Sequence, residues 1–158
     1  MPLNRAFVGR SYRAGGTFEV SREHIRRFAQ AIGDANPAYL DRSAATDLGH
    51  PDVVAPPTFL TTVGLSLPDA NGPLSDPDLG IDLGLVVHGE QRYVHHRPVR
   101  PGDELTATTT ITDIRDAGAN ELLSMTTEIR TTAGELVATS YNTIVSRGTA
   151  ATASGEAS

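Results

Sequence analysis

The segment GDANPAYL, residues 33–40, carries the side chains of this chain that are most suited to proton transfer. Asp34 can give or take a proton, and Asn36 can hold a neighbouring group by hydrogen bonds. Tyr39 stands where a histidine would be the obvious partner of the aspartate, and a phenol with a pKa of about 10 is a poor base near pH 7. A structural alternative is an Asx-type turn, in which the Asp34 carboxylate accepts backbone N–H groups.

The elements around this segment are predicted from periodicity and capping. TFEV, residues 17–20, is a short strand candidate, and Ser21 is the expected cap of a helix with Glu23 in its first turn. One apolar stripe runs along that helix, and Gly33 is the expected residue just past its end; the stripe is Ile25, Phe28, Ala29 and Ile32. The Asp34 segment therefore lies in a loop after a helix, and residues 41–50 indicate a second, capped turn of helix.

Residues 53–67, VVAPPTFLTTVGLSL, contain no charged side chain. Pro56 and Pro57 suit the first turn of a helix, and about eleven residues from there would form a helix that is apolar, and hence buried, on all sides. Phe59 is a core candidate in it. Residues 68–82 are polar and rich in turn formers, which predicts a long loop.

From residue 83 onward the pattern changes to a period of two. Four β-rich runs, separated by turn signals, predict an antiparallel sheet; they are residues 83–96, 104–114, 120–131 and 135–146. A long antiparallel sheet can cover an apolar helix by curling around it, which gives an α+β hotdog fold. We expect a single domain over residues 1–147 and a disordered tail over residues 148–158, whose Ala, Thr, Ser and Gly provide no packed face.

The overall composition excludes several classes of function. The 158 residues carry a net charge of −6, which argues against nucleic acid or an anionic membrane as a partner. All 13 basic residues are Arg, so lysine Schiff-base chemistry is excluded, and the absence of Cys excludes thiol nucleophiles and thiolate metal sites. With neither a signal peptide nor a long apolar run in view, the cytoplasm is the simplest expected location.

Three histidines near residue 90 do not predict a metal site. His95 and His96 are adjacent on a strand and so point to opposite faces, and His88 lies eight residues from His96, roughly 26 Å on an extended strand. We expect neither a metal nor a cofactor. His50, just before the apolar segment, is a candidate to replace the imidazole missing at position 39.

Arginines 92, 97 and 100 gather around HHRPVRPGD, residues 95–103. Guanidinium groups suit phosphate, so this cluster, Arg97 in particular, is a candidate contact for the phosphates of coenzyme A, for phosphopantetheine or for an acidic carrier protein. The structural alternative is a set of ordinary surface arginines.

Three segments together resemble the MaoC-like dehydratases: GDANP after an amphipathic helix, VVAPPTF before a buried helix, and HGEQRYVHHRPVRPGDELTATTTI. The resemblance spans roughly residues 3 to 147. It is strongest to the group of the FAS1-type dehydratase N-terminal domain, which includes the non-catalytic subunits of mycobacterial-type heterodimeric (3R)-hydroxyacyl-carrier-protein dehydratases. The resemblance implies a hotdog fold and a 2-enoyl or 3-hydroxyacyl thioester as substrate.

The resemblance also implies roles for particular residues. In catalytic members the motif is G-D-x-N-P-x-H, whose Asp and His act on one water molecule; Asp34 and Asn36 match it, and Tyr39 replaces the histidine. The thioester carbonyl is held by backbone N–H groups at the start of the buried helix. Pro57 stands near a position that is usually glycine and has no N–H, which leaves Thr58 as the donor. Phe59 then borders the acyl tunnel. The tyrosine at position 39 and the proline at position 57 both weaken the dehydratase chemistry that the resemblance implies.

Three functions follow from these observations. The first is a substrate-binding subunit of a 3-hydroxyacyl-thioester dehydratase, paired with a second hotdog chain in fatty-acid or polyketide elongation on a carrier protein or coenzyme A. The second is a self-sufficient homodimeric enzyme that uses Asp34 and another histidine, such as His50. The third is a non-enzymatic protein that binds acyl thioesters.

Overall fold

A computed structural model of the chain describes residues 1–69 and 72–151. Its sheet is antiparallel, with the strand order β1-β4-β5-β6-β3 and with β2 also paired to β4. The strands are β1 Ser11–Arg13, β2 Phe18–Glu19, β3 Val86–His95, β4 Glu104–Ala117, β5 Asn120–Thr131 and β6 Leu136–Ser146. The four predicted β-rich runs are thus confirmed as β3 to β6, in an antiparallel sheet as expected.

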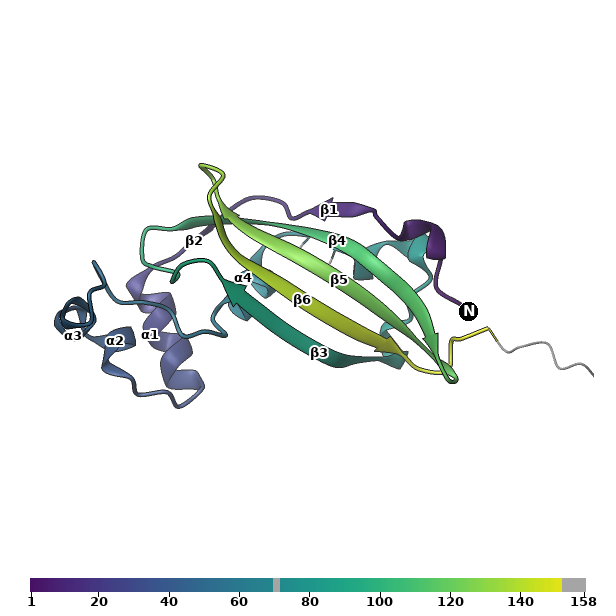
Figure 1. Cartoon of the computed structure of the whole chain (residues 1–158), viewed down its shortest axis with the longest axis horizontal. Helices are drawn as coiled ribbons and strands as arrows, with labels where there is room; N and C mark the ends of the chain where they lie inside the picture. Colours follow the sequence, from purple (N-terminus) through teal and green to yellow (C-terminus); the bar gives the residue numbers. More distant parts are fainter. Residues whose placement is uncertain (70–71, 152–158) are drawn as a thin grey trace, which may run out of the picture.

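Within the described residues, four α-helices accompany the sheet: α1 Arg22–Ala31, α2 Pro37–Leu40, α3 Arg42–Asp47 and α4 Leu60–Ser66. Figure 1 shows that α4 lies behind the curled sheet, whereas α1, α2 and α3 gather beyond one end of it. The arrangement matches the predicted α+β hotdog architecture. Among the described residues, no helix is long and apolar enough to cross a membrane.

The predicted boundaries of α1 are confirmed by its capping bonds. The Ser21 hydroxyl accepts a hydrogen bond from the His24 N–H at 3.1 Å, and the His24 ring nitrogen accepts one from the Ser21 N–H at 3.2 Å. Each partner thus satisfies a donor that the first turn of a helix leaves free. Gly33 ends the helix with a φ of +71°, a conformation that glycine adopts without steric cost. The loop after it carries Asp34.

The apolar segment before β3 departs from its prediction. The predicted helix of about eleven residues, buried on all sides, has seven residues, and a turn precedes it. In the single chain only one face of α4 is buried, through Leu60 and Val63, while Gly64 and Leu65 are exposed, Leu65 by 77%. The physical reason is that the sheet curls around one side of the helix and leaves the other side uncovered.

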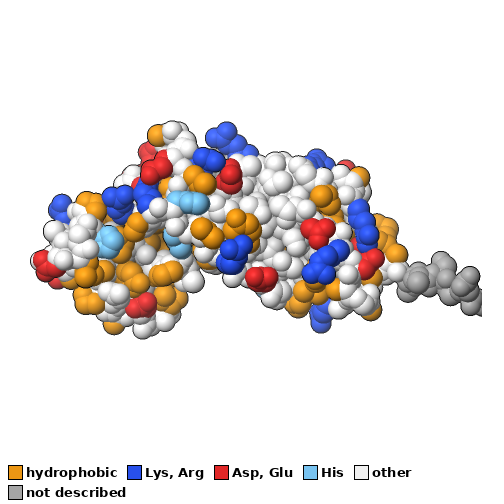
Figure 2. Space-filling model, in the orientation of Figure 1, with side chains coloured by type: hydrophobic (Ala, Val, Ile, Leu, Met, Phe, Trp, Pro, Cys, Tyr) orange, Lys and Arg blue, Asp and Glu red, His pale blue; other side chains and the backbone are white. Residues whose placement is uncertain are grey.

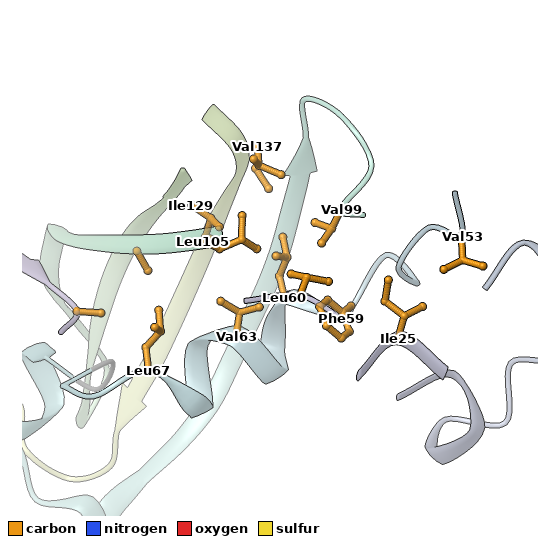
Figure 3. Packing of buried hydrophobic residues seen from close by; sticks show 14 residues of the cluster. Ile25, Val53, Phe59, Leu60, Val63, Leu67, Val99, Leu105, Ile129 and Val137 are labelled. Carbon is orange, nitrogen blue, oxygen red and sulfur yellow. The ribbon is translucent and has the colours of Figure 1, made fainter. Parts of the chain in front are cut away.

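The main hydrophobic core lies between α4 and the concave face of the sheet. Figure 3 shows Val63 and Leu60 pointing from the helix toward Leu105, Ile129 and Val137 on the strands. Val63, Leu105 and Val137 are each 0% exposed. This packing fixes the position of the turn that precedes α4, because the helix cannot slide along the sheet without opening cavities.

Further structural features were missing from the sequence prediction. β1, a three-residue strand, pairs with β4, and short 3-10 helices interrupt the predicted loop 68–82, of which residues 70 and 71 lie outside the described part. Residues of the predicted tail are also bound to the domain. The Gly148 N–H donates to the Asn120 side chain at 3.0 Å, and Thr149 is buried. These contacts extend the packed chain past the boundary predicted at residue 147; residues 152–158 of that tail lie outside the described part.

Candidate functional site

The Asp34 loop is held by its own side chains. The Asp34 carboxylate accepts the Asn36 N–H at 3.1 Å, and the Asn36 side-chain oxygen accepts the Ala38 N–H at 3.0 Å, which caps α2. Pro37 opens α2, where its missing N–H costs nothing. Asp34 and Asn36 therefore form the Asx-type turn that the sequence offered as the structural alternative. In each of these two side chains, one oxygen accepts a backbone N–H group of the loop and so holds its conformation.

Tyr39 lies on α2 close to Asp34 and packs, partly buried, against the main core and against a small cluster of Ala38, Ala45 and Val54. Burial raises the pKa of its phenol, and the negative charge of Asp34 raises it further. At neutral pH the Tyr39 side chain is therefore held as the neutral phenol, and even less of it is ionised than in free tyrosine. Position 39 cannot supply the base that an imidazole would supply there.

The turn before α4 presents one free backbone donor. The Phe59 N–H donates to Pro56 O at 3.0 Å, and the Thr61 N–H donates to Thr58 O at 3.1 Å. Within residues 1–69 and 72–151, the N–H of exposed Thr58 has no backbone acceptor, and Pro57 has no N–H to offer. Thr58 is therefore the residue of this turn that remains able to bind a carbonyl oxygen.

Two side chains of β3 fix this end of α4. Nε2 of His95 lies 2.9 Å from Pro57 O, and the Tyr93 hydroxyl lies 2.9 Å from the Thr61 hydroxyl. From the sequence, His95 is considered only as a possible metal ligand, and this positioning role is not predicted. The available signal was the strand alternation, which places residues 93 and 95 on one face and His96 on the other.

His50 is not brought to the Asp34 carboxylate by any hydrogen bond in the described part of the chain. Its backbone N–H donates to Ala45 O at 3.0 Å, at the end of α3, and its side chain is half-buried. Nε2 of His96 lies 3.2 Å from the Thr139 hydroxyl, on the face of the sheet opposite to His95. Residues 1–69 and 72–151 contain no group of three potential metal-ligating side chains.

Arg97 has structural partners instead of a free surface position. Its guanidinium forms paired hydrogen bonds with the Asp103 carboxylate at 2.8 and 2.9 Å and with Glu135 at 2.9 and 3.0 Å, and it also donates to Pro98 O. All five N–H groups are thereby used, and none remains for a phosphate. The geometry therefore corrects the expectation that Arg97 contacts the substrate: it ties the β3–β4 turn to the β5–β6 turn.

Replacing Arg97 by Met is expected to lower the free energy of unfolding by about 2–3 kcal/mol at pH 7, because the largely buried Asp103 loses its partner. The hydrogen bond from Arg97 lowers the pKa of Glu135, so the stability that this contact contributes is present at neutral pH and is lost as the pH falls through the lowered pKa. Urea unfolding should therefore show a smaller difference between wild type and variant in acid.

The control for Arg97 is Arg115→Met. Arg115 contacts Asp113 at 3.6 Å, and both side chains are more than half exposed, so its loss should cost less than about 1 kcal/mol at either pH. Equal destabilisation by the two substitutions would contradict the structural role of Arg97.

A cavity of about 270 Å³ lies between the concave face of the sheet and α4, whose buried and exposed residues both line it. Apolar side chains form part of its wall, among them Leu60, Val63 and Ile129. Exposed lining residues such as Leu65 and Gln91 place its opening between α4 and β3. Phe59, predicted to border the tunnel, is 0% exposed and does not line this cavity; it lies in the main core. Most of this lining could not be predicted from the sequence, because its residues come from five strands and from α4.

Residues 6–140 match the family model described as the FAS1-like dehydratase domain region. The chain belongs to this family. It is 55% identical to a UPF0336 protein of Parafrankia sp. (strain EAN1pec), over 95% of this chain and 98% of that protein. A second relative in the family, the UPF0336 protein of Streptomyces coelicolor, is 48% identical over 93% of this chain and 97% of its own length.

Solved structures agree with the family assignment. One, a MaoC-like dehydratase, shares 33% identity with a TM-score of 0.81, over 90% of this chain but 42% of that chain, so our chain spans less than half of that protein. Another is the HadBC (3R-hydroxyacyl-ACP dehydratase) complex from Mycobacterium tuberculosis, with 31% identity and a TM-score of 0.76 over 88% of this chain and 96% of the matched chain. The predicted hotdog fold and the resemblance to MaoC-like dehydratases are thus confirmed.

Proposed function

We propose that this chain is the substrate-binding subunit of a 3-hydroxyacyl-thioester dehydratase and pairs with a second hotdog chain that carries the catalytic Asp and His. The observation that carries the proposal is the state of position 39. A partly buried phenol, whose pKa is raised, replaces the imidazole that the dehydration needs as its acid and base. Acyl-carrier-protein or coenzyme A thioesters of fatty-acid or polyketide elongation, in the cytoplasm, are the proposed substrates.

The uncovered surfaces support a partner of the same fold. β3 closes one side of the strand order, and no strand of the described residues pairs with its outer edge, which could therefore pair with another chain. The exposed side of α4 and the opening of the cavity lie beside that edge. Leu65 of α4, beside that opening, is 77% exposed. A second hotdog chain placed there would cover this apolar surface and close the cavity into a tunnel.

The experiment combines this chain with a hotdog chain that has the intact G-D-x-N-P-x-H motif. We expect the two to co-elute as one complex, and we expect dehydration of a 3-hydroxyacyl thioester by the complex only. Light scattering should show this chain above its monomer mass of 16.7 kDa at micromolar concentration. Turnover by this chain alone would favour the homodimeric enzyme, and acyl binding without turnover in any combination would favour the non-enzymatic binding protein.

A further inference from the structure

A continuous row of hydroxyl side chains crosses the concave face of the sheet. The strand registers pair Tyr12 with Thr109, Thr109 with Thr127, Thr127 with Ser140, and Ser140 with Tyr93. Each of β1, β4, β5, β6 and β3 thus contributes one hydroxyl, and we call these five residues the hydroxyl row. All five line the cavity beside α4. Such a row is unusual for a surface that faces the interior of a domain.

The hydroxyl row separates two apolar regions. Ala107 and Ile129, two residues along β4 and β5 in one direction, belong to the core around α4. Ile111 and Met125, two residues along in the other direction, belong to a second core cluster near the far end of the sheet. Ala107, Ile129 and Met125 also line the cavity. An acyl chain bound in the cavity would therefore contact an apolar wall, then the hydroxyl row, and then a second apolar wall.

The row keeps unused hydrogen-bonding capacity. The hydroxyls of Thr109 and Thr127 lie 2.8 Å apart, and a single hydrogen bond between them uses only one of their two O–H groups. The pair formed by Tyr93 and Thr61 at 2.9 Å leaves one O–H free in the same way. Tyr12 alone donates outward, to the Asp76 carboxylate at 3.0 Å. The row can therefore donate further hydrogen bonds into the cavity.

Two amides beside the row add an acceptor. Asn142 donates to the Gln91 side-chain oxygen at 2.6 Å, and Gln91 donates to the Ser140 hydroxyl at 2.6 Å. The side-chain oxygen of Asn142 is buried and has no partner in the described part of the chain, and the Ser140 O–H has no protein acceptor there. An acceptor and several donors thus meet in one cavity. A plain hydrocarbon would leave them unsatisfied, and this carries a free-energy penalty.

We propose that this cavity binds an acyl chain that carries a hydroxyl group along its length, several carbons from the thioester. This inference rests on the proposed function and narrows its substrate class. A hydroxyl both donates and accepts, so it can donate to the Asn142 oxygen and accept from Ser140 or from the Thr109–Thr127 pair. The apolar walls on both sides of the row take the hydrocarbon segments on both sides of that hydroxyl.

The test measures binding of synthetic ligands to the purified full chain by calorimetry. The probes are a ten-carbon saturated acyl pantetheine, a series of isomers with one added hydroxyl at successive carbons, and pantetheine without an acyl chain. We expect one or two neighbouring isomers to bind about 3- to 10-fold more tightly than the saturated probe, since a net hydrogen bond between neutral groups changes affinity by roughly this factor. Pantetheine alone should bind much more weakly than any acylated probe.

Substitutions then assign the preference to the row. Thr127→Val and Asn142→Leu keep the approximate shape and remove hydrogen-bonding groups, so each should lower the preference for the hydroxylated isomer to about twofold or less. The matched control is Thr108→Val, on the neighbouring residue of β4, which faces away from the cavity; it should keep the wild-type preference. Circular dichroism of each variant checks that it is folded. If Asn142→Leu does not fold, Thr109→Val takes its place.

Three results would overturn the inference. They are equal affinity for saturated and hydroxylated probes, equal affinity for pantetheine alone, and a preference that survives Thr127→Val and Asn142→Leu. Dehydration by the complex of two hotdog chains is measured in parallel. If the complex is active but the chain does not prefer the hydroxylated probes, this inference is rejected and the proposed function stands. If the chain prefers the hydroxylated probes but no complex is active, the proposed function is rejected and the binding preference stands.

Discussion

Asp34→Asn is expected to leave dehydration by the complex within about threefold of wild type, whereas the same substitution at the partner's motif should lower the rate by about 10²–10⁴-fold. Asparagine can accept the Asn36 N–H as the carboxylate does at 3.1 Å, so the loop and the cap of α2 should remain intact. The partner's aspartate and histidine would still carry the proton transfers. The two substitutions thus differ by about 3–5 kcal/mol in activation free energy.

The comparison is made by steady-state dehydration of one 3-hydroxyacyl thioester by the two complexes, with equal complex concentrations verified by light scattering. A companion variant, Tyr39→His, restores an imidazole to this chain but does not restore the N–H that Pro57 lacks, so it should create at most weak activity in the chain alone. If Asp34→Asn cripples the complex as strongly as the partner's substitution, the subunit assignment is wrong and Asp34 is a working catalytic group.

Phe59→Ala is expected to lower the free energy of unfolding by about 3–5 kcal/mol. Phe59 is 0% exposed, and its ring meets those of Phe28 and Phe18 edge to face, at centroid distances of 5.6 and 6.2 Å. It therefore joins α1, and with it the Asp34 loop, to the start of α4. Removing the ring leaves a cavity at the junction of these three elements, and the measurement is urea unfolding of the purified chain.

The matched control for Phe59 lies on α4, the helix that Phe59 directly precedes. Leu65→Ala removes an apolar side chain that is 77% exposed and should cost less than about 1 kcal/mol in the isolated chain. Leu65→Ala should also weaken the association with a hotdog partner if the uncovered side of α4 is the interface. A cost below about 1 kcal/mol for Phe59→Ala would show that the junction does not depend on this ring.

Some features of this protein were predictable from local sequence alone. The bounds of α1 follow from Ser21 and Gly33, and the extent of β5 follows from its alternating pattern and flanking turns, because capping and strand alternation involve residues close together in the chain. The presence of a phenol and no imidazole at position 39 can equally be read from the sequence alone. The Asp34–Asn36 turn was foreseen as one of two alternatives, since an aspartate two residues before a backbone donor suits both a turn and a proton transfer.

Only the tertiary structure decided the rest. The length of α4 depends on where Leu60 and Val63 meet the sheet, and the exposure of Leu65 depends on which side of the helix the sheet covers. The saturation of Arg97 requires Glu135, which is 38 residues away. The hydroxyl row combines single residues of five strands, and no spacing along one strand predicts it. The physical reason is common to these cases: sequence periodicity tells which face of an element is apolar, but strand register and packing decide which faces meet.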